Sequence, residues 1–353
     1  MSNIKQTLVI VESPAKCKKI ESYLGLGYKC VASFGHIREL NKKKGIKCID
    51  IENNYKPDFN LVSHQMKNIS SLRKNIGLYD EVLLATDDDR EGEAIAWHIC
   101  QVFKLPIKTT KRIIFHEITK SALEKAVKNP TVIDMKKVDS QKARQVLDLL
   151  VGYSISPLLW KYINKTSASS LSAGRCQSPA LRLVYDNYME VKDNPGEECY
   201  SINGIFDSKK LNFKLNKNIE RKELVKEFLE ESKYYKHKLT KYKPRVTKKK
   251  SPEPFTTSSL QQKASNILHY SPKDTMRICQ NLYECGLITY MRTDSKYYSK
   301  EFIDKTKALL IKKYGSEYIS DNIEDITLKG GREKKEINKN KTKKDVNAQE
   351  AHE

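Results

Sequence analysis

The run TDDDREGE at residues 86–93 has the composition of a metal site. In an extended turn alternate residues lie on one side, so Asp87, Asp89 and Glu91 would concentrate carboxylate oxygens there. Magnesium prefers a few carboxylates together with water and substrate phosphate. Most acidic runs are solvated loops, but this one stands between an apolar run and helix-compatible sequence, where an active site is expected. We therefore predict that these three side chains bind Mg²⁺.

A second chemical feature is the segment GLITYMRTDS at residues 286–295. Tyrosine has an ordinary pKa of ~10, so forming phenolate at pH 7 costs about 4 kcal/mol unless a cation or base assists. Arg292, two positions after Tyr290, supplies a permanent cation that can also bind a phosphate through two hydrogen bonds. Most of the 19 tyrosines are packing residues. The neighbouring arginine distinguishes Tyr290 as a candidate nucleophile.

Short apolar runs at residues 7–11 and 81–85 are typical of buried parallel strands. Each is followed by a polar turn and helix-compatible sequence, which predicts an α/β sheet. Ligands collect at the carboxyl ends of the strands in such a sheet. Glu12 follows the first run and the acidic run follows the second, so both lie where a site is expected.

The rest of the chain predicts helical and α+β segments in a multidomain protein. From about residue 134 the sequence is amphipathic and helix-like, with a break at Pro157. Residues 198–242 alternate like antiparallel strands around a charged, helix-like insert near 220–232. The segment TTSSLQQKASNIL then starts a helix with Thr or Ser as its N-cap, and helical character continues to about 313. The predicted domains are an α/β domain at 1–133, a helical domain at 134–197, a β-rich segment at 198–253 and a helical domain at 254–353.

Composition favours a polyanionic partner. The chain has 65 Lys and Arg against 44 Asp and Glu, a formal charge of +21 that is spread along the sequence. The eight cysteines include no C-x-x-C pair, and no apolar run approaches the ~20 residues of a membrane span. We expect a soluble intracellular protein with reduced thiols, no signal peptide and no zinc. The sequence has no G-x-x-x-x-G-K-[ST] pattern, so we expect no use of ATP.

The combination of Glu12 with the acidic run resembles the Toprim domain, which topoisomerases share with bacterial primases and some nucleases. Over nearly its whole length the chain resembles the type IA DNA topoisomerases, and YMRTDS, LSAGRCQS and AHE are similar to their topoisomerase I branch. Eight ordered blocks carry the resemblance: VIVESPAK (9–16), SFGHIREL (33–40), ATDDDREGEAIAWH (85–98), QKARQVLDLLVGYSISPLLW (141–160), LSAGRCQSPALRLV (171–184), PFTTSSLQQKAS (254–265), ITYMRTDS (288–295) and NAQEAHE (347–353).

The resemblance implies Mg²⁺-dependent, ATP-independent cleavage and religation of a single-stranded segment in negatively supercoiled DNA, which relaxes the duplex. Tyr290 would form a 5′-phosphotyrosine link and release a 3′-hydroxyl. Arg292 would steady the phosphate, Lys16 would contact it, and Glu12 would be a proton-transfer group or a neighbour of the metal. Further residues in the blocks are implied to line the DNA path or the active site: His36, Arg112, Arg144, Arg175, Gln177 and His352.

The resemblance also implies a type IA toroid made of a Toprim domain, a helical domain, a partial β arch and a helical tyrosine domain. The sequence stops at Glu353 inside a block that the family continues, so we expect the C-terminal part of the toroid to be missing. Residues 1–353 would then cleave DNA but relax it poorly without a complementing part.

Two other interpretations are open at this point. The chain could be a truncated, non-catalytic DNA-binding remnant or one part of a split enzyme. It could also be a Toprim primase or nuclease, which nucleotide polymerisation, or hydrolysis without a protein adduct, would reveal. We expect a cytoplasmic or nucleoid-associated location and no membrane partner.

Overall fold

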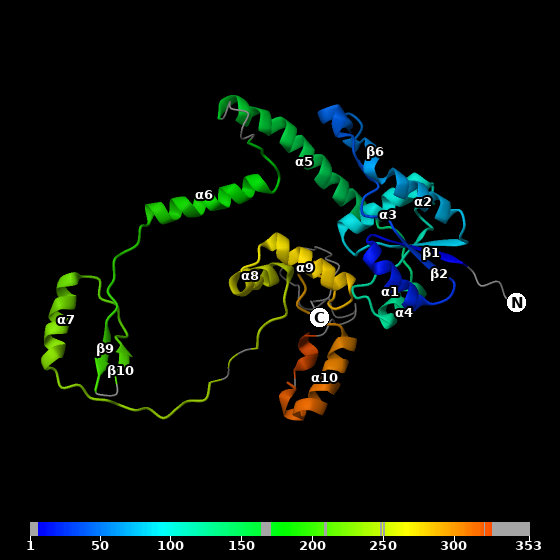
Figure 1. Cartoon of the computed structure of the whole chain (residues 1–353). Coiled ribbons are helices and arrows are strands. Elements are labelled where there is room, and N and C mark those ends of the chain that lie inside the picture. The colour runs from blue at the N-terminus through cyan, green and yellow to red at the C-terminus, as the bar shows by residue number, and fades with distance from the viewer. Residues whose placement is uncertain are drawn as a thin grey trace, which may run out of the picture. The chain divides into compact units, whose positions relative to one another are not determined.

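The computed structural model describes residues 6–163, 171–207, 210–247, 249, 251–320 and 322–326. The chain divides into two compact units, one formed by residues 1–153 with 251–353 and the other by residues 154–250 (Figure 1). The segment that carries Tyr290 therefore belongs to the same unit as the acidic run. The predicted domain borders at 133, 197 and 253 stay predictions.

The first unit is built on a parallel four-stranded sheet in the order β2-β1-β7-β8. The expected strands at 7–11 and 81–85 are neighbours in this sheet, and Val11 pairs with Ala85 at their carboxyl ends. Glu12 and the acidic run therefore leave the sheet at one edge, and the predicted α/β fold is confirmed. The strands are β1 (Thr7–Val11), β2 (Tyr28–Ala32), β7 (Glu81–Ala85) and β8 (Lys111–Arg112).

Every residue of β1 is buried because helices cover both faces of the sheet. Leu8 and Ile10 join an apolar cluster with side chains of α2 and α3, whereas Val9 and Val11 join a cluster with side chains of α1 and α4. Each buried aliphatic side chain contributes about 1.5–3 kcal/mol, so these clusters fix the strand ends. The covering helices are α1 (Pro14–Leu24), α2 (Met66–Ile76), α3 (Arg90–Phe103) and α4 (Lys120–Lys128).

A small extension between β2 and α2 holds two antiparallel strand pairs, β3 with β6 and β4 with β5. Leu40, Cys48 and Ile49 of this extension form an apolar cluster with Val146 and Leu149 of α5, which anchors the first half of that helix. The extension contains β3 (Arg38–Leu40), η1 (Lys42–Cys48), β4 (Ile49–Asp50), β5 (Lys56–Pro57), β6 (Phe59–Leu61) and η2 (Ser63–Gln65).

Helix α5 (Met135–Tyr162) passes through Pro157 without ending. The predicted break at Pro157 is therefore wrong. A proline removes one backbone hydrogen bond and crowds the carbonyl four residues earlier, here that of Tyr153, but the other turns keep their own bonds. The border between the two units falls directly after Tyr153.

Three helices complete the first unit, and each begins at a side-chain cap. The N-caps Thr256, Ser271 and Ser299 accept hydrogen bonds from the first turn of their helices, which confirms the expected helix start in the TTSS segment. Residues 285–299 are not helical, so the expected helical character up to about 313 is interrupted where Tyr290 lies. The elements are α8 (Thr257–Leu268), α9 (Pro272–Glu284), α10 (Lys300–Tyr314), η3 (Ser316–Tyr318) and η4 (Ile323–Ile326).

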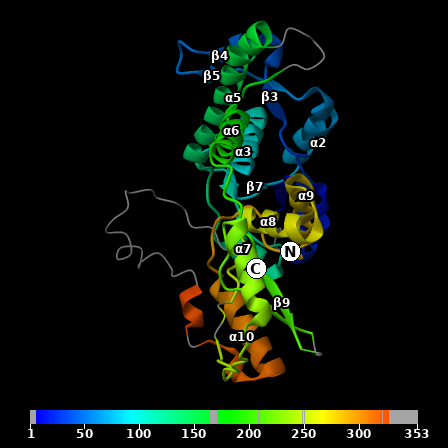
Figure 2. The same ribbon diagram turned by 90° about the vertical axis from the view of Figure 1, so that its left-hand side faces the viewer.

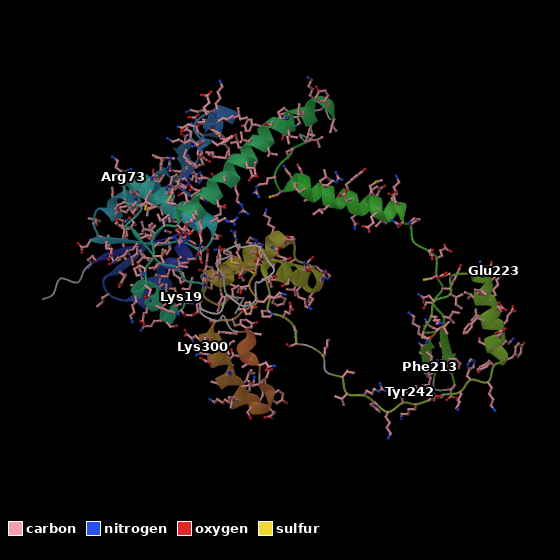
Figure 3. The ribbon with its side chains drawn as sticks, turned by 180° about the vertical axis from the view of Figure 1, so that it is seen from behind. Lys19, Arg73, Phe213, Glu223, Tyr242 and Lys300 are labelled. Atoms are coloured by element: carbon pink, nitrogen blue, oxygen red, sulfur yellow. The ribbon has the colours of Figure 1, made fainter. Side chains whose placement is uncertain are left out.

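Helix α9 packs on the same apolar cluster as α1 and α4 and lies beside α8 (Figure 2). Cys279 and Tyr283 of α9 and Met291 of the following segment are buried in it. Lys19 of α1, labelled in Figure 3, donates a hydrogen bond of 2.6 Å to the carbonyl of Cys285, directly after α9. The Tyr290 segment is therefore attached to the sheet through both side chains and backbone.

The described part of the second unit contains the end of α5, a β-hairpin and the helices α6 and α7. Its strands pair Leu211 with Phe206 in antiparallel register, and a charged helix follows, as the alternating sequence and its insert predicted. The elements are α6 (Gln177–Asp193), β9 (Asn203–Phe206), β10 (Leu211–Lys214) and α7 (Lys222–Tyr234). Across the described part of both units, no helix has the length and apolarity to cross a membrane.

Candidate active site

The acidic run forms a tight turn between β7 and α3. Asp89 has extended backbone angles and caps α3, and its Oδ1 accepts a 2.8 Å hydrogen bond from the N–H of Gly92. A Cβ at Gly92 would lie 2.1 Å from the carbonyl oxygen of Asp87, so only glycine fits. Glu91 already belongs to the first turn of α3. The expected extended turn with alternating side chains is therefore wrong, because the helix starts within the run.

Asp87 and Asp88 point to different partners. Asp87 forms an ion pair with the ammonium of Lys16. Asp88 forms a 3.0 Å hydrogen bond with Nε2 of His116 and accepts one of 2.8 Å from Nζ of Lys137. Burial alone would raise the pKa of Asp88, but these two bonds outweigh it and hold the pKa well below its usual range. Asp88 is therefore an ionised anchor of the turn.

The candidate nucleophile Tyr290 lies at Asp89. The hydroxyl of Tyr290 donates a hydrogen bond of 2.5 Å to Oδ2 of Asp89, and Nη1 of Arg292 donates one of 3.1 Å to the same oxygen. Tyr290 is 6% exposed, whereas the side chain of Arg292 is 54% exposed. Burial, and then the charges of Asp89 and Asp87, raise the pKa of Tyr290 far above its ordinary value. The phenol is therefore held in its protonated form.

Backbone hydrogen bonds fix the segment around the tyrosine. The N–H of Tyr290 donates to the carbonyl of His116 at 2.7 Å. The hydroxyl of Thr257, in the first turn of α8, lies 2.9 Å from the carbonyl oxygen of Met291 and 3.1 Å from that of Thr293. His116 thus connects the nucleophile's backbone to the acidic turn, through its bond to Asp88.

Glu12 and Lys16 flank this turn from the start of α1. The pKa of Glu12 is raised to about 7, mainly by burial and also by the charges of Asp87 and Asp89, while the charges of Lys16 and His36 oppose the rise. A carboxyl group with this pKa exchanges protons near neutral pH. Lys16 is fully buried and paired with Asp87, and the phosphate contact expected for it stays a prediction.

Glu91 is oriented by groups from two other elements. It accepts a hydrogen bond of 2.9 Å from Nε2 of Gln141 and forms one of 3.1 Å with Nε2 of His36. The pKa of Glu91 is lowered mainly by its hydrogen bond with His36, and the charge of Arg144 also lowers it. His36 and Arg144, both expected near DNA, are therefore grouped around Glu91.

The resemblance implies that Arg112 lines the DNA path or the active site. Its side chain is fully buried beneath the acidic turn, where Nη2 donates to the carbonyl of Asp87 at 2.9 Å and lies 3.1 Å from Oε2 of Glu93. Glu93 in turn accepts a 2.7 Å hydrogen bond from the N–H of Asp134. A guanidinium without solvent access cannot bind a DNA backbone, so Arg112 supports the turn from inside.

Three of the expected site residues are not placed at this cluster. Arg175 and Gln177 belong to the second unit, where Nε2 of Gln177 bonds the hydroxyl of Ser172 at 3.2 Å. His352 lies outside the described residues. Their expected roles stay predictions.

The donor chemistry of the carboxylates fits magnesium. Asp87 and Asp89 both raise the pKa of Glu12, a charge crowding that a divalent cation relieves. Within the described ranges, however, no three such side chains are arranged as ligands of one metal ion. In this structure Asp87 is engaged by Lys16, Asp89 by Tyr290 and Arg292, and Glu91 by Gln141 and His36.

Sequence reasoning missed several residues that complete the cluster. Asp88 stood in the acidic run but was not assigned, and its place in the run was a usable signal. The others come from elements whose packing no local pattern reveals: His116 after β8, Lys137 and Gln141 on α5, and Tyr283 on α9.

The chain was compared with known protein families and solved structures. A family model for the Toprim domain matches residues 7–118, and one for DNA topoisomerase matches residues 132–353. The structure of full-length topoisomerase I from Thermotoga maritima is similar over 89% of this chain, with 40% sequence identity and a TM-score of 0.75. The similarity spans 54% of the Thermotoga chain, so this chain corresponds to about half of that relative. The chain belongs to the type IA DNA topoisomerases and carries their Toprim domain.

Proposed function

We propose that this chain cleaves and reseals one DNA strand by transesterification at Tyr290, with magnesium and without ATP. The observation that carries the proposal is the shared contact at Asp89. One carboxylate oxygen accepts both the nucleophile's hydroxyl, at 2.5 Å, and the exposed guanidinium of Arg292, at 3.1 Å. The phenol thus has a carboxylate that can accept its proton, and that carboxylate also binds a cation suited to a phosphate.

The reaction balances within these groups. Oη of Tyr290 attacks the phosphorus, its proton passes to Asp89, and the new phenolic ester forms as the bond from phosphorus to the 3′-oxygen breaks. The leaving 3′-oxygen takes a proton from Glu12, whose pKa of about 7 leaves it partly protonated at neutral pH. Resealing is the reverse reaction, and the free energy of the broken phosphodiester bond is conserved in the phosphotyrosine bond until then.

Asp87, Asp89 and Glu91 are the residues that would hold magnesium. When bound, the ion would neutralise negative charge on the phosphate and on the carboxylates around it. Arg292 orients the phosphate, and the ion pair of Lys16 with Asp87 keeps a second cation beside the reaction.

The proposed substrate is a single-stranded segment of negatively supercoiled DNA. The formal charge of +21 supports a polyanionic partner, and topoisomerase I of Thermotoga maritima is a related protein. Relaxation of a plasmid is proposed for the whole enzyme. Binding should weaken with salt by a logarithmic slope of ~0.7 for each phosphate that the protein neutralises on a single strand.

A cleavage assay tests the proposal. Single-stranded DNA labelled at its 3′ end is incubated with the protein and magnesium, and denatured adducts are separated by mass. The label should migrate with the wild-type protein and not with Tyr290→Phe, because only the hydroxyl is lost. Tyr297→Phe, which changes a half-exposed tyrosine in the same segment, is the matched control and should form the adduct. Adduct formation by Tyr290→Phe would exclude Tyr290 as the nucleophile.

A further inference from the structure

Tyr283 lies between Tyr290 and Lys16 of the proposed cleavage site and is itself shielded from solvent. It lies in the last turn of α9 and is fully buried. Its ring centroid is 5.2 Å from that of Tyr290, with the planes at 65°, and Nζ of Lys16 lies 4.7 Å from the same centroid. We propose that Tyr283 is a positioning residue for strand cleavage, whose ring holds the phenol of Tyr290 and the ammonium of Lys16. The inference rests on the proposed function of Tyr290.

The contact with Lys16 restricts an otherwise flexible cation. Lys16 is fully buried, and its ammonium pairs with Asp87 and lies over the ring of Tyr283. An aromatic ring attracts a cation through its negative face, most strongly where water is excluded. The ring therefore helps to keep the ammonium beside Asp87. Without that ring, Lys16 would lose one of the contacts that fix its position.

The contact with Tyr290 sets the direction of the nucleophile. The two rings meet edge to face, the arrangement that ring quadrupoles favour. The hydroxyl of Tyr290 has one acceptor, Asp89, and a single hydrogen bond permits the ring to swing about it. Tyr283 supplies the second constraint. A displacement of ~1 Å at a reacting group can reduce a rate by about 100-fold.

The hydroxyl of Tyr283 takes no part in this role. It is buried and has no hydrogen-bond partner in the described part of the chain. Burial, reinforced by the charges of Asp87 and Glu12, raises its pKa well above the ordinary value, so it stays neutral. The positioning effect therefore lies in the aromatic ring, and a phenylalanine at this position should support cleavage as the tyrosine does.

Single-turnover cleavage of 3′-labelled single-stranded DNA tests the inference. We expect Tyr283→Phe to cleave within about threefold of the wild type, and Tyr283→Leu to lose about 100-fold in the rate at saturating DNA. The Kd for DNA should change less than about threefold, because Tyr283 is buried. Tyr23→Leu, at a partly buried tyrosine packed against the same apolar cluster, is the matched control and should cleave normally.

A fluorinated ring separates positioning from simple filling of space. Phenylalanine with three ring fluorines at position 283 keeps the volume and weakens the negative face of the ring, so cleavage should fall below that of Tyr283→Phe. This fluorinated variant also tests the role of the ring if Tyr283→Leu does not fold. Wild-type rates for the leucine or fluorinated variant, or loss of cleavage in Tyr283→Phe, would overturn the inference. Absence of any adduct in the wild type would instead refute the proposed function.

Discussion

The pH dependence of stability gives a direct test of the charge arrangement around Glu12. Burial raises the pKa of Glu12 from an ordinary value of 4.5 to about 7, with Asp87 and Asp89 adding to the rise and Lys16 and His36 opposing it. A group whose pKa is higher in the folded state stabilises the fold at low pH, and this contribution is lost as pH rises through the folded pKa. The difference between a pKa of 4.5 and one of about 7 corresponds to about 3 kcal/mol in the free energy of unfolding.

Glu12→Gln removes this titration. Relative to the wild type, the variant should gain about 2–3 kcal/mol in free energy of unfolding as pH rises from 4.5 to about 7, with no further gain above pH 8. Partial exposure of Glu12 to solvent puts the value at the lower end of that range. The measurement is denaturant unfolding at a series of pH values, in EDTA so that no divalent cation shifts the equilibrium.

The control is Glu124→Gln, at an exposed glutamate of α4 whose carboxylate lies 3.9 Å from Nζ of Lys120. Its stability relative to the wild type should stay nearly constant over the same pH range, because solvent screens an exposed pair. If Glu12→Gln also gives a constant difference, Glu12 does not titrate near neutrality and cannot supply the proposed proton. Added magnesium should reduce the gain in Glu12→Gln, since a cation favours the ionised glutamate of the wild type.

Three further predictions test how the acidic turn is supported. Arg112→Met leaves Glu93 buried without its cation and should cost about 3–5 kcal/mol in denaturant unfolding, which adding Glu93→Leu should largely restore. Gly92→Ala places a Cβ 2.1 Å from the carbonyl of Asp87, so adduct formation should be lost even if circular dichroism shows retained helix content. Asp89→Asn keeps an N-cap but loses the proton acceptor, so unfolding should change by less than about 1 kcal/mol while single-turnover cleavage falls by about 100-fold or more.

The strands that carry the site follow directly from sequence. Residues 8–11 and 82–85 are continuous apolar runs, as expected for strands that helices cover on both faces. Their pairing in register also follows from the parallel fold, which brings Glu12 and Asp87 to one edge. The geometry of the acidic turn was not predictable from alternation, because capping by Asp89 starts the helix inside the run.

The partners of the site residues were harder to foresee because they come from distant segments. Arg292 suggested a cation near Tyr290, but their shared acceptor is Asp89, 201 positions before the tyrosine in the chain. That contact depends on how α9 packs against the sheet, and no local periodicity specifies it. Arg112 is a related case: the resemblance implied a place along the DNA path or in the active site, but its buried partner Glu93 could not be foreseen from the sequence.

The arrangement at Asp89 also limits when the tyrosine can react. Burial, and then the charges of Asp89 and Asp87, disfavour the phenolate, while Arg292, with more than half of its side chain facing solvent, opposes them. An incoming phosphate competes with Asp89 for Arg292, and Asp89 is then free to accept the phenolic proton. In the proposed mechanism, the same carboxylate thus holds Tyr290 protonated in the absence of DNA and becomes its base when a phosphate binds Arg292. Cleavage chemistry is thereby coupled to occupancy of the phosphate position, which protects a buried tyrosine from ionising without a substrate.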